Sequence, residues 1–228
     1  MAPAPRSTTF VLVHGAWAGS WCWVRVADRL IARGHRVYAP TLSGLGERSH
    51  LADSEIDLTT HVNDVVNEIR WKDLHQIVLV GHSYAGFVIT GVAERLRERI
   101  ASIVYVDAFI PTDGQSFADL APWLDRTQRM TPPPPSTEGD FVDEVDRAWA
   151  DSKATAQPTA TFTESLSVTG AYQRIRTKIY VCATNGPLSR NADPLLSDAS
   201  WTIYDVESGH DVEIDAPDRL VQILEAAI

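Results

Sequence analysis

The stretch Ile77-Val78-Leu79-Val80-Gly81-His82-Ser83-Tyr84-Ala85-Gly86 sets a serine among small residues, directly behind an apolar run. The run has the length and composition of a buried strand, and the segment after the serine, 84–97, has helical spacing. A tight strand-turn-helix needs small residues two before and two after the serine, here Gly81 and Ala85, so that the backbone can fold sharply and leave Oγ exposed. We therefore predict that Ser83 lies at a turn between a strand and a helix.

The rest of the chain repeats this alternation of short strands and helices. Nearly every residue in the expected strands is apolar, which is typical of strands covered on both faces. The expected strands are Thr9–Val13, Arg36–Tyr38, Ile77–Val80, Ile103–Val106, Ile179–Cys182 and Thr202–Val206, and the expected helices are 21–32, 58–71, 84–97 and 217–227. The pattern predicts an α/β fold with a mostly parallel central sheet of about six strands flanked by helices.

Residues 112–175 break this pattern. They contain the run Thr131-Pro132-Pro133-Pro134-Pro135-Ser136, followed by a helical pattern over 141–149. A connection of this length is usually functional or disordered, and a run of prolines is too stiff for a helix or a central strand. We predict a small inserted cap at 112–175, with residues 1–111 and 176–228 forming the core.

Composition limits the classes of partner. The chain has 228 residues, 44% of them hydrophobic, and a net charge of −10, so an anionic nucleic acid or membrane surface would be repelled. Its two cysteines, Cys22 and Cys182, lie among apolar residues, which indicates buried thiols in a reducing compartment. No signal-like segment and no stretch of about 18 apolar residues occurs. We expect a cytoplasmic protein with a small-molecule partner; the oligomeric state, a homodimer included, stays open.

The predicted place of Ser83 suits a nucleophile, because open parallel sheets bind ligands beyond the carboxyl ends of their strands. The alternative is an ordinary serine at a helix N-terminus. A serine nucleophile needs a base, and His210, just after the last expected strand and next to Gly209, is the best placed histidine. The backbone N–H groups of Ala16 and Tyr84 are the expected oxyanion donors, with Trp17 the nearest competitor of Ala16.

Four segments together resemble the α/β-hydrolase superfamily: Val11 to Trp17, Gly34 to Val37, Val80 to Ser83, and Gly209-His210. Within it, the region from Phe10 to Trp23 and the helix after it look most like the branch of plant methylesterases, α-hydroxynitrile lyases and related bacterial esterases. The G-x-S-x-G motif departs at its fifth position, where Ala85 stands and Gly86 follows. The resemblance implies a nucleophile, an acid and a histidine in that order along the chain.

The acid of the triad is the open question. In the resembling plant enzymes it follows the penultimate strand, where this chain has Asn185. An amide can hold a histidine tautomer but supplies no negative charge. Asp107 ends the strand after the nucleophile's helix, a placement similar to that in haloalkane dehalogenases whose acid follows the same strand. We predict Asp107 as the acid and keep Asp193 as the reserve, because triads are recognised by geometry.

These residues predict a serine esterase that cleaves carboxylic esters through an acyl-enzyme, with a small or aryl ester, a methyl ester or a lactone as substrate. The resembling lyases carry a threonine where Gly15 stands and a lysine where Asp211 stands. Both lyase features are absent here, so a lyase ranks second to the esterase. A non-catalytic small-molecule receptor is the third. Trp17, Phe109 and Trp123 are the predicted substrate-binding residues, and we expect neither a metal nor a cofactor.

Overall fold

The computed structural model of the chain describes residues 7–137, 140–188 and 191–228. A six-stranded sheet with the order β2-β1-β3-β4-β7-β8 runs through it, and every neighbouring pair is parallel. The strands are β1 (Thr9–Val13), β2 (Arg36–Tyr38), β3 (Ile77–His82), β4 (Ile100–Val106), β7 (Thr177–Ala183) and β8 (Trp201–Val206). The predicted α/β class with six parallel strands is confirmed, and all six lie where expected, several of them longer.

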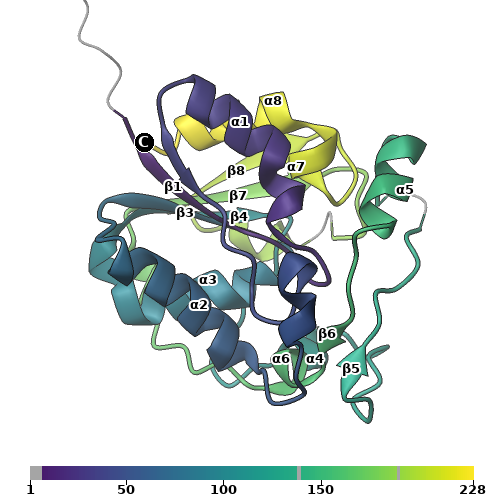
Figure 1. Ribbon diagram of the computed structural model, residues 1–228. Helices are drawn as coiled ribbons and strands as arrows, with labels where there is room; N and C mark the ends of the chain where they lie inside the picture. Colours follow the sequence, from purple (N-terminus) through teal and green to yellow (C-terminus); the bar gives the residue numbers. More distant parts are fainter. Residues whose placement is uncertain (1–6, 138–139, 189–190) are drawn as a thin grey trace, which may run out of the picture.

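Helices cover both faces of the sheet (Figure 1). They are α1 (Val24–Ala32), α7 (Val212–Asp215) and α8 (Pro217–Glu225) on one face, and α2 (Leu58–Trp71) and α3 (Ala85–Leu96) on the other. Successive strand side chains point to opposite faces, so Phe10 and Leu12 pack with α1 and α8, whereas Val11 and Val13 pack with α2 and α3. This division explains why the strands read as continuous apolar runs.

Helix α3 passes so close to the chain after β4 that one position has no room for a side chain. A Cβ atom added to Gly86 would lie 1.8 Å from the backbone oxygen of Phe109. The glycine that this turn requires is therefore Gly86, and Ala85 at the preceding position is accommodated with its side chain fully buried. The departure from the G-x-S-x-G pattern thus leaves the close contact of helix and strand end intact.

Gly86→Ala is expected to lower the free energy of unfolding by about 3 kcal/mol or more, because the added methyl group must displace backbone rather than a flexible side chain. Urea unfolding followed by circular dichroism measures the change. Gly34→Ala is the matched control: Gly34 has a φ of 89° and nothing within 4 Å of an added Cβ, so only the backbone conformation opposes it, at about 1 to 2 kcal/mol. Equal losses in the two variants would contradict the steric account.

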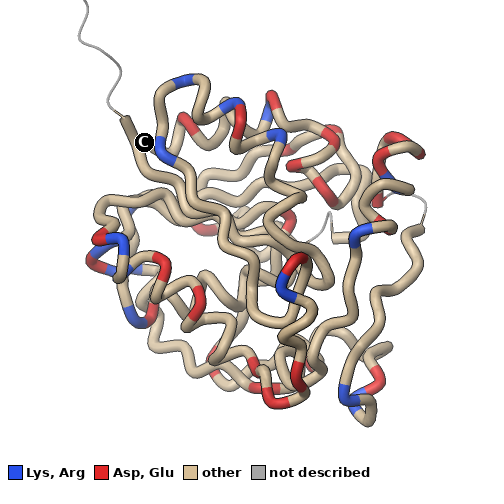
Figure 2. Tube along the Cα trace, viewed as in Figure 1, with Lys and Arg blue, Asp and Glu red and all other residues tan. Residues whose placement is uncertain are grey.

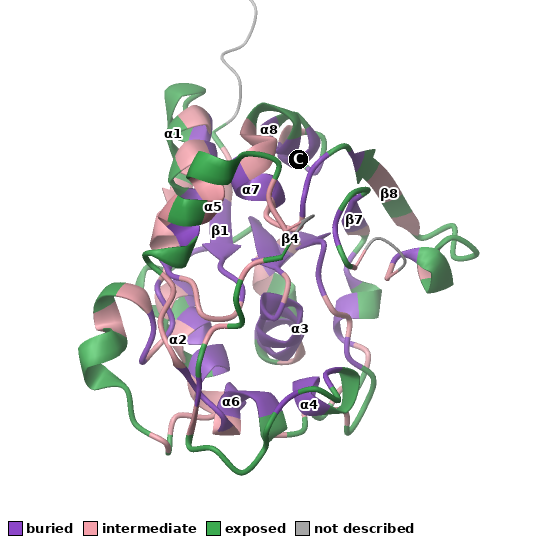
Figure 3. Ribbon diagram, turned by 90° about the vertical axis from the view of Figure 1, so that its right-hand side faces the viewer, coloured by how far each residue is buried: buried purple, intermediate pink, exposed green. Residues whose placement is uncertain are grey.

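The segment 112–175 lies over the carboxyl ends of the strands and consists of short elements (Figure 3). They are α4 (Phe117–Leu120), β5 (Met130–Thr131), α5 (Glu144–Asp151), β6 (Gln157–Pro158) and α6 (Ala160–Thr163), with β5 and β6 antiparallel. The helix expected over 141–149 is displaced toward the C-terminus, because the Asp143 carboxylate accepts the backbone N–H groups of Val145 and Asp146 and so caps the helix at Glu144. The described prolines 132–135 have no regular secondary structure.

Several 3₁₀ turns complete the described chain: Ser20–Trp23, Gly46–Leu51, Arg97–Arg99, Tyr172–Arg174 and Asp193–Leu195. Basic residues alternate with acidic ones along the chain trace (Figure 2). Cys22 and Cys182 are buried thiols. Among the described residues, no helix has both the length and the apolar character needed to cross a bilayer.

Candidate active site

Ser83 directly follows β3 in a strained backbone conformation. Its φ is 53°, a left-handed value that costs free energy for any residue other than glycine and persists only where the surroundings impose it. Three backbone hydrogen bonds hold it: the Ser83 N–H donates to the Val106 oxygen at 3.1 Å, and the Ser83 oxygen accepts the N–H groups of Gly86 at 3.0 Å and Phe109 at 3.2 Å. The turn is thereby tied to the neighbouring strand β4, and it presents the hydroxyl at the carboxyl end of the sheet's strands.

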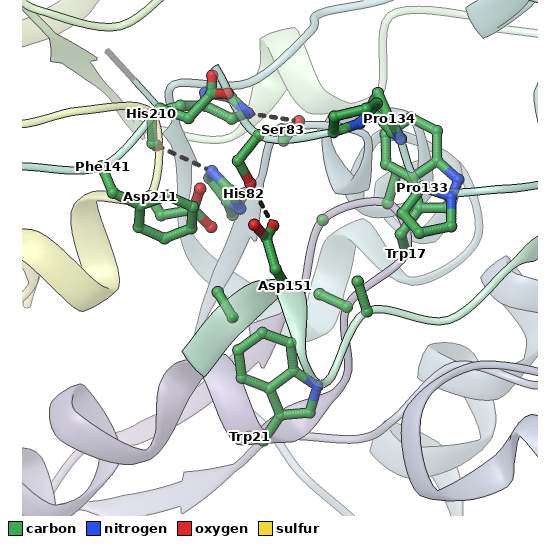
Figure 4. A pocket seen from close by; sticks show the side chains of 18 residues that line it. Trp17, Trp21, His82, Ser83, Pro133, Pro134, Phe141, Asp151, His210 and Asp211 are labelled. Carbon is green, nitrogen blue, oxygen red and sulfur yellow. Dashed lines mark hydrogen bonds between the residues drawn. The ribbon is translucent and has the colours of Figure 1, made fainter. Parts of the chain in front are cut away.

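The structure brings Ser83, His210 and Asp107 into one hydrogen-bonded line. His210 Nε2 lies 2.9 Å from Ser83 Oγ, and His210 Nδ1 lies 2.6 Å from Asp107 Oδ2. The three residues follow β3, β8 and β4, so they converge only because these strands share a parallel sheet. Figure 4 shows the His210 ring pointing toward Ser83.

Asp107 is fully buried, and both its backbone and its side chain are hydrogen-bonded. Its own N–H donates to the Val181 oxygen at 2.7 Å, and its Oδ1 accepts the Ala183 N–H at 3.2 Å, which leaves Oδ2 for the imidazole. Its φ of 39° is also left-handed. The alternative residues Asn185 and Asp193 are exposed, whereas His210 Nδ1 forms its hydrogen bond with Asp107.

The electrostatics around His210 favour its protonated form. Burial opposes a charged imidazole, but the hydrogen bond to Asp107 and the charges of Asp211 and Asp107 outweigh burial and raise the pKa of His210 above its ordinary value. An imidazole of raised pKa next to a hydroxyl can take the hydroxyl proton, because the cation that forms is stabilised by the carboxylate.

The loop after β1 lies against the turn at Ser83. A Cβ on Gly15 would lie 2.9 Å from His82 Nδ1 and 3.2 Å from Ser83 Cβ, so the backbone at this point approaches the serine closely. The loop is fixed by the buried His14, whose Nδ1 donates to the Gly15 oxygen at 2.8 Å while Nε2 accepts the Leu42 N–H at 3.0 Å. Burial lowers the pKa of His14 to about 4, so this neutral pattern holds at physiological pH.

The three candidate oxyanion donors differ in what they already bind. The Trp17 N–H donates to the Gln157 side-chain oxygen at 2.9 Å. No backbone hydrogen bond among the described residues uses the N–H of Ala16 or of Tyr84. Ala16 and Tyr84 thus remain available for a ligand, and Trp17 is committed to the β6 segment.

Two cavities meet at Ser83 and His210. The smaller, of about 160 Å³, is bounded by the loop after β1, by the proline run and by Asp211. The larger, of about 810 Å³, is walled by aromatic and aliphatic side chains. All three predicted substrate-binding residues, Trp17, Phe109 and Trp123, line the larger cavity, and Trp17 also lines the smaller one.

Behind His210 lies a buried group that the sequence did not reveal. His82, Asp211 and Glu213 place one nitrogen or oxygen atom each within 4.8 Å of one another, and they are the group among the described residues whose chemistry could hold a metal ion. His82 stands next to the nucleophile, which is the one signal that could have pointed to it. Glu213 gives no such signal, because a glutamate in a short helix is normally exposed.

Comparisons with known proteins show the family to which this chain belongs. A family model described as the alpha/beta hydrolase family matches residues 10–223. The carbendazim hydrolyzing esterase of Nocardioides sp. (strain SG-4G) is 35% identical over 95% of this chain and 98% of its own length. Methylesterase 2 of Arabidopsis thaliana is 33% identical over 51% of this chain and 45% of its own length.

Solved structures extend the likeness to the whole fold. An extracellular alpha/beta-hydrolase from a Paenibacillus species, described as sharing structural and functional homology with tobacco salicylic acid binding protein 2, superposes with a TM-score of 0.84 at 27% identity and covers 96% of this chain and 98% of that one. The chain belongs to the alpha/beta hydrolase family, in the branch of plant methylesterases and bacterial esterases, and is a carboxylic ester hydrolase.

Proposed function

We propose that this chain is a serine esterase in which Ser83 is the nucleophile, His210 the general base and Asp107 the acid of a catalytic triad. The observation that carries the proposal is the unbroken line of hydrogen bonds, at 2.9 Å from Ser83 Oγ to His210 Nε2 and 2.6 Å from His210 Nδ1 to Asp107 Oδ2. The same constellation of serine, histidine and acid recurs on several unrelated folds that use a serine nucleophile.

The reaction proceeds in two halves. Ser83 Oγ attacks the ester carbonyl while His210 Nε2 takes its proton, and the resulting imidazolium then gives that proton to the departing alcohol. Water attacks the acyl-enzyme in the second half, again with His210 as base, and releases the acid. Asp107 holds the imidazole with its proton on Nδ1 and stabilises the cation in both halves.

The backbone N–H groups of Ala16 and Tyr84 are the proposed oxyanion donors. Both are without a backbone acceptor in the described chain, while the competing Trp17 N–H already binds Gln157. Tyr84 also stands at the N-terminus of α3, where the helix dipole adds positive potential at the developing oxyanion. Each such donor contributes roughly 3 kcal/mol to the transition state.

The proposed substrate class is an ester with one bulky apolar or aryl part and one small part. An ester has two sides, and two cavities of about 160 Å³ and 810 Å³ meet at the serine. The larger lies within the usual range for sites that bury a small molecule, and Phe109, Phe117 and Trp123 give it aromatic walls. The relatives named as methylesterases fit an ester with a small alcohol part.

The lyase alternative fits the site less well. Asp211 lines the smaller cavity where the resembling lyases carry a lysine. Burial, which is the largest cause, raises the pKa of the Asp211 carboxyl to about 7, so this group is neutral or negative near neutral pH. Neither form offers the positive charge that would stabilise a departing cyanide.

Two measurements on the purified protein test the proposal. We expect hydrolysis of p-nitrophenyl butyrate and covalent labelling of Ser83 by a fluorophosphonate, because an activated serine reacts with both. Mandelonitrile serves as the control substrate and should release no cyanide above background. A folded protein that neither hydrolyses the ester nor takes up the label would indicate the receptor alternative.

A further inference from the structure

Trp17, in the loop after β1, is held by the β5–β6 region through all three of its hydrogen-bonding groups. Its backbone N–H donates to Gln157 Oε1 at 2.9 Å, its indole Nε1–H donates to the Thr131 oxygen at 3.1 Å, and its own oxygen accepts the Thr155 N–H at 2.9 Å. The loop that carries the proposed oxyanion donor Ala16 is therefore fixed from outside the central sheet.

These contacts hold Trp17 in a strained backbone conformation. Its φ is 59°, a left-handed value that residues other than glycine adopt only where their surroundings impose it. Thr131 and Gln157 are paired residues of β5 and β6, so both donors of Trp17 bind neighbouring points of one small sheet. Without these acceptors the backbone would relax, and the peptide group between Ala16 and Trp17 would turn with it.

The Ala16 N–H lies between two tethered peptide groups. The peptide that carries it also carries the Gly15 oxygen, which accepts the His14 Nδ1–H at 2.8 Å. Because a peptide group is planar and trans, its N–H and its C=O point in opposite directions, so His14 sets the direction of the Ala16 N–H. The next peptide group ends in the Trp17 N–H that Gln157 accepts. Ala16 is thus fixed by the core on one side and by Gln157 on the other.

The Gln157 side chain can present its oxygen to Trp17 in one way only. Gln157 is 0% exposed, its Nε2 donates to Thr161 Oγ1 at 2.8 Å, and the Thr161 hydroxyl donates in turn to the Pro158 oxygen at 2.7 Å. Since that hydroxyl hydrogen is committed to a carbonyl, Thr161 Oγ1 accepts from the amide, which places the amide nitrogen toward Thr161 and the amide oxygen toward Trp17.

We propose that Gln157 is a positioning residue for oxyanion binding: by accepting the Trp17 N–H it keeps the Ala16 N–H directed at the substrate carbonyl and withdraws the Trp17 N–H from that role. The inference rests on the proposed function, in which Ser83 is the nucleophile and Ala16 an oxyanion donor. The residues of the central sheet then form only part of the oxyanion site, and the β5–β6 region supplies the acceptor that orients it.

Gln157→Met tests this role. Methionine has a similar length and no strong acceptor, so the Trp17 N–H loses its partner. We expect kcat for p-nitrophenyl butyrate to fall about 100-fold with KM within about twofold of wild type, because the misplaced donor acts on the transition state. An aryl trifluoromethyl ketone, which forms a hemiketal oxyanion on an active serine, should bind more weakly by the factor by which kcat/KM falls. The pH midpoint of kcat/KM should not move, because the contacts of His210 are untouched.

Two further variants separate positioning from packing. Gln157→Glu keeps an oxygen acceptor of the same reach, and the Thr161 hydroxyl can turn to donate to its second oxygen, so kcat should stay within about fivefold of wild type. Thr159→Val removes the buried hydrogen bond between the Thr159 and Thr131 hydroxyls, which are 2.8 Å apart, and should lower the thermal midpoint while leaving kcat and ketone binding at wild-type values. A loss of kcat in either variant equal to that in Gln157→Met would overturn the proposal.

Amide NMR spectra of the wild type give a readout that needs no variant. Binding of the ketone should move the amide proton of Ala16 strongly downfield, because it gains a hydrogen bond to an oxyanion. The amide proton of Trp17 should stay nearly unchanged, because Gln157 already accepts it. A larger shift at Trp17 than at Ala16 would overturn the proposal.

The outcomes distinguish this inference from the proposed function. Wild-type kcat and ketone affinity in Gln157→Met would refute the positioning role and leave the serine esterase standing. A shifted pH midpoint in that variant would assign its loss of activity to His210 and would refute the positioning role as well. A folded wild type that neither hydrolyses the ester nor binds the ketone would refute the proposed function itself.

Discussion

Ser83→Ala is expected to reduce kcat for p-nitrophenyl butyrate by on the order of 10⁶-fold, since removal of the nucleophile disables the whole triad at once. Among the described residues, the Ser83 hydroxyl forms its hydrogen bond with His210 Nε2. Alanine adopts the left-handed conformation at a cost similar to that of serine, so the variant should fold as wild type does. Steady-state hydrolysis together with circular dichroism measures both effects.

The control for Ser83→Ala is Ser200→Ala, which removes the hydroxyl of an exposed serine just before β8. We expect wild-type turnover and full fluorophosphonate labelling in the control, and no labelling in Ser83→Ala. Turnover that persists in a folded Ser83→Ala protein, with the label found on another peptide, would assign the reaction to a different nucleophile.

The fold was predictable because its strands are buried on both faces. Such strands read as short apolar runs in any parallel sheet, and Ile77 to Val80 is the clearest of them. The N-terminus of α5 was not predictable to the residue, because it depends on which acidic side chain caps the helix, and Asp143 competes with other acids nearby. The need for glycine at position 86 could not be predicted either, because it depends on the close approach of Gly86 to the backbone of Phe109.

The candidate site was predictable in part. Ser83 and His210 lie in motifs whose spacing already predicts a strand end, whereas Asp107 was one of several acids at the ends of strands, and only strand order and register determine which of them meets His210. The burial of Glu213 could not be predicted from the sequence. It follows from the packing of a four-residue helix, α7, against α1 and the 3₁₀ turn at Ser20–Trp23. Sequence patterns give the chemistry at a strand end more readily than the groups that hold it in place.

Asp107→Asn is expected to lower kcat by about 10⁴-fold while leaving the fold intact, because the substitution reverses the tautomer of His210. The Ala183 N–H needs an acceptor at position 107, so the amide oxygen of the asparagine turns toward Ala183 and its NH₂ group faces His210 Nδ1. The imidazole must then accept at Nδ1 and carry its hydrogen on Nε2. In that tautomer Nε2 has no lone pair with which to take the proton of Ser83.

The comparison that decides the identity of the acid uses three single variants and one double variant. Asp193→Asn and Asn185→Asp should retain wild-type kcat, because the hydrogen bond of His210 Nδ1 goes to Asp107. Near-normal turnover in Asp107→Asn combined with a large loss in Asp193→Asn would move the acid to the loop after β7, where the reserve candidate Asp193 lies. Partial recovery in the double variant Asp107→Asn/Asn185→Asp would show that this loop can still supply a carboxylate to His210, and hence that the two placements of the acid are alternative solutions on one scaffold.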